Sequence, residues 1–148
     1  MGGVLYLHDI STKRFTSTAR KNLDMFTRIC GGASMKKTIL VTTNWEKRTS
    51  DKLYIRRERE MKEHWKPIIQ QGGEVRRFLR TRESAREIIN DLLRSADLEV
   101  PLLLPAQLVN HQIPFSKTEA GRYAVSAGKQ KEKEQNKFMD RLPGCMIQ

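Results

Sequence analysis

The clearest chemical motif of this sequence lies at its carboxyl end. The chain ends in Cys145-Met146-Ile147-Gln148, which fits the C-a-a-X pattern, and a terminal glutamine favours farnesyl transfer to the cysteine thiol. A single attached lipid gives only marginal membrane binding, but basic residues near the lipidated cysteine add to it because anionic lipids attract them. Acidic residues dilute the basic set that precedes the motif, namely Lys129, Lys131, Lys133, Lys137 and Arg141. We expect reversible membrane association through farnesylated Cys145; the alternative is a free terminal cysteine.

Other patterns of catalytic or metal-binding residues are missing from the local sequence. The three histidines, His8, His64 and His111, lie far from one another and from the cysteines, whereas metal ligands usually recur at short spacings. Neither a Cys-x-x-Cys pair nor a Ser, His and Asp set can be assembled from neighbouring residues. The local sequence therefore predicts no metal site and no independent catalytic site.

One segment imitates a phosphate-binding loop. Residues 31–38 have the sequence GGASMKKT, in which Lys36 replaces the second glycine of the G-x-x-x-x-G-K-[ST] motif. That motif also needs a strand before it and a helix after it, so that the first amides of the helix face the anion. Here the pattern predicts a helix before and a strand after. We interpret residues 31–38 as a helix-to-strand turn.

The elements that would position a site alternate along the first two thirds of the chain. Continuous apolar or β-branched runs predict strands at Val4–Leu7, Thr38–Thr43 and Val75–Leu79, the last of them interrupted by arginines. Helical periodicity follows each strand, in the sets Ala19, Leu23, Phe26 and Cys30, then Met61, Trp65, Ile68 and Ile69, then Ala85, Ile88, Ile89, Leu92 and Leu93. This alternation predicts a parallel sheet and an α/β fold.

The ends of these helices carry recognisable signals. The first helix has Thr16, Ser17 or Thr18 as its cap and Gly31 as its stop. The second helix runs from Asp51 to the glycine pair at 72–73. In the third, Ser84 with Glu87 fits a capping box.

Composition and length limit the remaining possibilities. The chain has 148 residues with 28 basic and 17 acidic side chains, a net charge of +11, which suits anionic partners without selecting one. The longest uncharged apolar stretch, residues 100–109, is shorter than the roughly 20 residues of a membrane-spanning helix. The start lacks the features of a secretory signal and the two cysteines lie far apart. We expect a cytoplasmic protein.

The pattern changes near residue 98 and again near residue 129. We predict a short helix starting near Pro105 and stopped by Pro114, and another over Thr118–Ala127. Residues 129–141 are dominated by Lys, Glu, Gln and Asn and predict a solvated helix or a disordered tail. The expected organisation is an α/β part at 3–97, a helical extension at 98–128 and a basic flexible tail at 129–148.

Four segments resemble successive blocks of one protein family. They are GVLYLHDIS at 3–11, LVTTNWE at 40–46, RFLRTRESA at 77–85 and KTEAG at 117–121. Together they resemble the fungal G-domain proteins, P-loop GTPase relatives of septins and of the immunity-associated GTPases, over residues 3–125. The resemblance implies the C-terminal half of a Ras-like G domain, that is, a partial parallel-sheet P-loop NTPase fold with a C-terminal helical extension, and GTP or GDP as ligand.

The same resemblance implies that the phosphate half of the site is not in this sequence. In that family a Gly-x-x-x-x-Gly-Lys-Ser/Thr loop, a switch threonine and an Asp-x-x-Gly motif precede the first block. We therefore expect these parts upstream of Met1 and no magnesium site in this chain. Phosphoryl transfer depends on a metal and oriented donors around the β- and γ-phosphates. GTP hydrolysis is thus the family's activity, but we do not expect it from this chain alone.

The resemblance retains the half that recognises guanine. The family's Asn/Thr-Lys-x-Asp motif aligns with Thr43-Asn44-Trp45-Glu46, so Glu46 would offer its two carboxylate oxygens to two N–H donors of the base. Glu46 is one methylene longer than the family's aspartate, and Asn44 replaces the lysine that lies over the base. The alternative for Glu46 is a glutamate of a helix start or loop. Trp45 we interpret as a packing residue.

The last guanine motif of the family aligns with residues 81–85. There a backbone N–H after Ser84 or near Ala85 would meet the oxygen of the base. The alternative is an ordinary helix N-cap, and the two interpretations are compatible because a capping site points free N–H groups outward.

Two other function classes remain open. One is a basic interaction module for acidic proteins, a membrane surface or nucleic acid; we do not expect nucleic acid, because no aromatic-interleaved basic motif or recognition helix is present. The other is a prenylated scaffold whose exposed sheet edge leads to self-association or pairing with a complete G domain.

Overall fold

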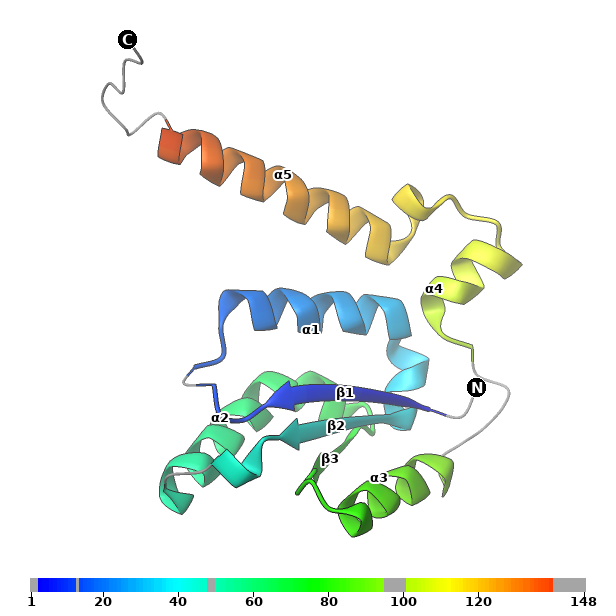
Figure 1. Ribbon diagram of the computed structural model, residues 1–148. Coiled ribbons are helices and arrows are strands. Elements are labelled where there is room, and N and C mark those ends of the chain that lie inside the picture. Colours follow the sequence, from blue (N-terminus) through cyan, green and yellow to red (C-terminus); the bar gives the residue numbers. More distant parts are fainter. Residues whose placement is uncertain (1–2, 13, 48–49, 95–100, 140–148) are drawn as a thin grey trace.

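The computed structural model describes residues 3–12, 14–47, 50–94 and 101–139, with backbone only from residue 134 onward. Cys145 and the rest of the C-a-a-X motif lie outside these residues. Figure 1 shows a small sheet between helices, with one long helix on the outside.

The sheet has three parallel strands in the order β1-β2-β3. They are β1 (Val4–Asp9), β2 (Thr38–Thr43) and β3 (Glu74–Arg77). β1 pairs with β2 from Val4 opposite Thr38 onward, and β2 pairs with β3 from Ile39 opposite Glu74. The predicted α/β fold with a parallel sheet is confirmed. β3 ends earlier than predicted, at Arg77, although the amide of Phe78 still donates to the Thr42 carbonyl (2.8 Å).

Two helices cover one face of the sheet, α1 (Ser17–Cys30) and α2 (Asp51–Gln70). Their apolar residues form the main core with Leu40 of β2, whose side chain is fully buried. Trp65 of α2 is also fully buried and meets the ring of Tyr6 edge-on. The residues of this core are Leu23, Cys30, Met35, Leu40, Met61, Trp65 and Ile68.

Of the described helices, α3 (Arg82–Arg94) alone packs on the opposite face of the sheet. Its Ile88 contacts Ile39 and Val41 of β2, and together they form a smaller core. On this face of β1, Leu5 and Leu7 are 38% and 64% exposed, which shows that α3 does not extend over β1. The two faces of the sheet are therefore covered unequally.

The ends of the helices agree with the sequence at one place and differ at another. Of the three candidate caps of α1, Thr16 is the cap: its hydroxyl accepts a hydrogen bond from the Ala19 amide (3.1 Å). The helix ends at Gly31, whose φ of 76° favours glycine. The Ser84 and Glu87 capping box is wrong, because α3 already begins at Arg82 and the Thr81 hydroxyl caps the Ser84 amide.

The C-terminal part is helical and packs on α1. α4 (Leu103–Pro105) is followed by a π-helical segment (Ala106–Asn110), so this helix starts before Pro105 rather than near it. α5 (Glu119–Met139) continues well past the predicted end at Ala127 and across the expected boundary at 128/129. Figure 1 shows it along the outer side of α1.

Tyr123 holds α5 on α1. Its hydroxyl lies 3.3 Å from an Asp24 carboxylate oxygen, and the Arg28 guanidinium lies 4.8 Å from the centre of its ring. Both partners come from α1, so one side chain joins the two helices through a polar contact and a cation–π contact.

The start of α5 depends on a glycine. The Thr118 hydroxyl accepts from the Gly121 amide (3.0 Å), and a Cβ at Gly121 would lie 1.7 Å from the Phe115 carbonyl oxygen. We predict that Gly121→Ala lowers the free energy of unfolding by about 1–3 kcal/mol, measured by urea denaturation, because the turn must open to admit the methyl group. The matched control is Gly128→Ala in the same helix, where a Cβ meets no atom within 4 Å. It should be neutral or stabilise by up to about 1 kcal/mol. Equal effects of the two variants would contradict this account.

Candidate functional site at the carboxyl edge of the sheet

The two segments predicted to recognise a base lie next to each other. They follow β2 and β3, and the carboxyl ends of neighbouring parallel strands meet at one edge of the sheet, where open α/β sheets bind their ligands. An ion pair joins the segments, because the Arg80 guanidinium donates to Oε1 of Glu46 (3.2 Å). The structure therefore brings Glu46 and the start of α3 together.

Glu46 is an accessible acid at this edge. Its side chain is 33% exposed, and the side chain of Arg80 is 74% exposed. The Arg80 backbone has a φ of 61°, in the left-handed region that non-glycine residues rarely adopt. No described hydrogen bond or ion pair involves Oε2 of Glu46. Sequence reasoning missed Arg80 as the partner of Glu46, since the two residues lie 34 positions apart.

Asn44 is oriented toward β1. Its φ of 63° turns the chain sharply after β2, and its side chain hydrogen-bonds to Asp9 at the end of β1. The Asp9 carboxylate also accepts from the Ser11 amide (2.8 Å). Asn44 thus joins the ends of two strands, which is a different role from the lysine that it replaces in the resemblance.

Thr43 also joins β2 to β1. Its hydroxyl donates to the His8 carbonyl (3.3 Å), and its own carbonyl accepts from the Ile10 amide (3.2 Å). The polar groups of Thr43 are therefore used in holding the two strands together. Among Thr43, Asn44 and Glu46, Glu46 carries the carboxylate, and its Oε2 has no described partner.

Trp45 lies in a small buried cluster with Ile10 and Tyr54 and is 4% exposed. Its indole N–H donates to the Thr42 hydroxyl (3.0 Å), and the Arg77 guanidinium lies 4.4 Å from the centre of its rings. Its interpretation as a packing residue is confirmed.

Ser84 and Ala85 close the turn into α3. The buried Ser84 hydroxyl donates to the Thr81 carbonyl (3.0 Å) and accepts from the Leu79 amide (3.2 Å). The Ser84 amide donates to the Thr81 hydroxyl (3.1 Å) and the Ala85 amide to the Thr81 carbonyl (3.2 Å). Both amides are already used, so the amides of the first turn without an intrahelical acceptor are those of Arg82 and Glu83.

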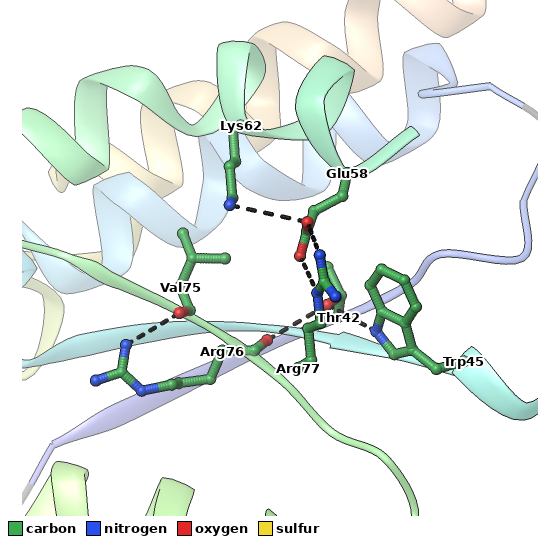
Figure 2. A network of polar contacts seen from close by, with 7 residues as sticks. All are labelled: Thr42, Trp45, Glu58, Lys62, Val75, Arg76 and Arg77. Atoms are coloured by element: carbon green, nitrogen blue, oxygen red, sulfur yellow. Dashed lines mark hydrogen bonds and ion pairs between the residues drawn. The ribbon is translucent and has the colours of Figure 1, made fainter. Parts of the chain in front are cut away.

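An ion pair between a half-exposed arginine and a nearly buried glutamate lies next to this edge (Figure 2). Glu58 of α2 has a side chain only 7% exposed, and it accepts two hydrogen bonds from the Arg77 guanidinium, Nε to Oε1 at 2.7 Å and Nη2 to Oε2. Hydrogen bonding to Glu58 raises the pKa of Arg77. Lys62 lies 3.8 Å from the same carboxylate. Sequence reasoning missed this pair and took Arg77 only as an interruption of a strand.

The described residues contain no cluster of three or more His, Cys, Asp or Glu side chains arranged to hold a metal ion. Cys30 is buried, and burial raises the pKa of its thiol to about 11, which makes it unreactive. Within the same described ranges, no helix is long and apolar enough to span a membrane.

Comparisons with protein-family models, curated proteins and solved structures give no match to this chain.

The Glu58 and Arg77 pair gives a test of the support under the site. We predict that Arg77→Met lowers the free energy of unfolding by about 2–4 kcal/mol in urea denaturation, because it leaves a nearly buried carboxylate with Lys62 alone. The double variant Glu58→Gln with Arg77→Met should regain part of this loss. The control Arg56→Met removes an exposed ion pair on the same helix, with Glu60 at 3.7 Å, and should cost less than about 1 kcal/mol. A loss of similar size in the control would contradict a special role for Arg77.

Asp9 gives a pH-dependent test. Burial opposes its ionisation, but hydrogen bonds from Ser11 and Asn44 and the charge of Lys47 outweigh burial and lower the pKa of Asp9. A lowered folded pKa stabilises the protein above the unfolded value of about 3.9, and this contribution disappears as the pH falls through the folded pKa.

We therefore predict that Asp9→Asn destabilises the protein at pH 7 and that the difference from the original chain shrinks in acid. The free energy of unfolding measured in urea at several pH values between 7 and 3 checks this. Glu63→Gln, at an exposed position of α2, should show no such trend. A constant difference across the pH range would rule out the Asp9 charge as the cause.

Proposed function

We propose that this chain supplies the base-recognising half of a guanine-nucleotide site, with Glu46 as the residue that selects guanine. The observation that carries the proposal is the position of Glu46: a carboxylate about one third exposed after β2, joined through Arg80 to the turn that starts α3. The parallel order of β1, β2 and β3 and the resemblance of the sequence blocks support it. The fold that we propose for the whole domain is accordingly the C-terminal half of a P-loop NTPase.

The chemistry of guanine suits these groups. Guanine presents two neighbouring donors, N1–H and the 2-amino group, and a carboxylate presents two acceptors. Arg80 binds Oε1 of Glu46 and leaves Oε2 without a described partner, so a base would replace Arg80 or share the carboxylate with it. The acceptor oxygen of guanine would meet the free amides of Arg82 and Glu83 rather than those of Ser84 and Ala85.

The proposal covers recognition of the base and does not include hydrolysis. The sequence has no G-x-x-x-x-G-K-[ST] loop, and residues 31–38 form a short helical turn into β2 as expected from their pattern. A nucleotide would bind tightly only where another polypeptide segment supplies the phosphate and magnesium half. Farnesylation of Cys145 lies outside the described residues and stays a prediction of the sequence.

Three nucleoside monophosphates test the role of Glu46. GMP, IMP and AMP each carry one phosphate on the same sugar and differ only in the base. We predict that the chain binds GMP more tightly than IMP by about tenfold, since IMP lacks the 2-amino donor to the carboxylate. AMP should bind more weakly still. The measurement is an NMR titration at constant salt.

The decisive variant is Glu46→Gln. Its amide offers one acceptor and one donor group, so the preference for GMP over IMP should disappear while IMP binds about as before. Glu63→Gln serves as the matched control and should keep the preference. The proposal fails if the unsubstituted chain does not distinguish GMP from AMP, or if Glu46→Gln leaves the preference intact.

A further inference from the structure

The face of the sheet that carries α3 leaves an apolar groove open beside β1. The groove has a volume of about 180 Å³ and is lined by Leu5, Leu7, Val41, Phe78, Ile88 and Ile89. Leu7 is 64% exposed, and Leu93 on the same helix as Ile89 is 61% exposed. Parallel sheets normally have both faces covered, and contiguous exposed apolar side chains mark an interaction surface.

The backbone of β1 is open at the same place. Among the described residues, β1 lies at the edge of the sheet and pairs with β2 alone. The Ile10 amide donates to the Thr43 carbonyl, and backbone groups of a strand alternate between its two sides. It follows that the backbone N–H and C=O groups of Tyr6 and His8 face β2. Those of Leu5 and Leu7 face away from the sheet. The residues with free backbone groups are thus those with exposed apolar side chains.

Charge indicates which kind of strand fits this edge. On α3, the positions 82, 86, 89 and 93 follow one stripe of the helix surface, and they hold Arg82, Arg86, Ile89 and Leu93. Ile89 lines the groove. Both arginines are exposed, and no ion pair among the described residues involves them. The stripe therefore presents two positive charges next to the apolar groove.

We propose that β1 and this groove bind an acidic polypeptide that adds a β-strand to the sheet. The strand would pair with the free backbone groups of Leu5 and Leu7, its apolar side chains would cover the groove, and its carboxylates would meet Arg82 and Arg86. A second copy of this chain fits less well, because each copy carries a net charge of +11 and like charges repel. The peptide test contains no nucleotide, so this proposal and the proposed function fail separately.

Amide hydrogen exchange and two synthetic peptides provide the test. The acidic probe is Glu-Glu-Val-Thr-Val-Thr-Val-Glu-Glu, and its matched control has lysine in place of every glutamate. In the free protein, the amides of Leu5 and Leu7 should exchange faster than those of Tyr6 and His8. The acidic probe should slow hydrogen exchange of the Leu5 and Leu7 amides by about tenfold or more at saturation. The lysine peptide should leave these exchange rates unchanged.

Variants locate the binding surface. Leu7→Lys and Arg86→Glu should each weaken binding of the acidic probe by about tenfold or more, and both positions are exposed, so circular dichroism should show an unchanged fold. Ile55→Lys, at an exposed apolar position of α2, should bind the probe normally.

Three results would overturn the proposal: no protection of Leu5 and Leu7, equal binding of the two peptides, or a dimer in sedimentation that Leu7→Lys dissociates. The last result would assign the groove to a second copy of the chain.

Discussion

The structure depends on the burial of β2 on both of its faces. Its residues from Thr38 to Thr42 are at most 2% exposed, and β2 is the one described strand with a neighbour on each side. A strand in this position requires apolar cover above and below. α1 and α2 supply the cover on the Leu40 side, and α3 supplies it on the side of Ile39 and Val41. The crossover connections between parallel strands already place helices on the faces of the sheet, so the burial of one strand accounts for the helices on both of its faces.

Two neighbouring arginines of β3 attach these layers to the sheet. Side chains of a strand alternate between its faces, so Arg76 lies on the α3 side and Arg77 on the α2 side. Arg76 bonds to Asp91 of α3 (2.7 Å), and Arg77 bonds to Glu58 of α2. Each covering helix thus provides one carboxylate for one arginine of the same strand. The carboxylate on the α2 side is the more buried of the two, and this pair also places the Arg77 guanidinium over Trp45, the residue before Glu46.

The elements with strong local patterns could be predicted from the sequence, and the contacts between them could not. The apolar runs at β1 and β2 and the periodicity of α1, α2 and α3 each follow from neighbouring residues, and their order predicts the parallel sheet. The sequence predicts a β3 interrupted by Arg76 and Arg77, because the acidic partners of these arginines lie 15 and 19 positions away. At the site, Glu46 and the start of α3 were expected to lie together and do so, whereas the turn of Asn44 toward Asp9 and the use of the Ser84 and Ala85 amides inside their own turn depend on tertiary geometry. The helix cap was assigned to Ser84 instead of Thr81 because both are good capping residues and the local pattern does not distinguish them.

The unequal cover of the sheet connects the open edge with the candidate site. A strand added beside β1 in the same direction would end next to Asp9, and Asp9 already bonds to Asn44 at the start of the segment that carries Glu46. The chain that follows such a strand would then enter the carboxyl edge of the sheet from the side opposite Arg80. An antiparallel strand would bring its first residues to that place instead. In either direction, an occupant of the apolar groove lies beside β1, whose last residue, Asp9, contacts Asn44 in the segment that carries Glu46. β2, the strand next to this edge, is itself covered by α1 and α2 on one face and by α3 on the other, so its burial does not depend on an added strand.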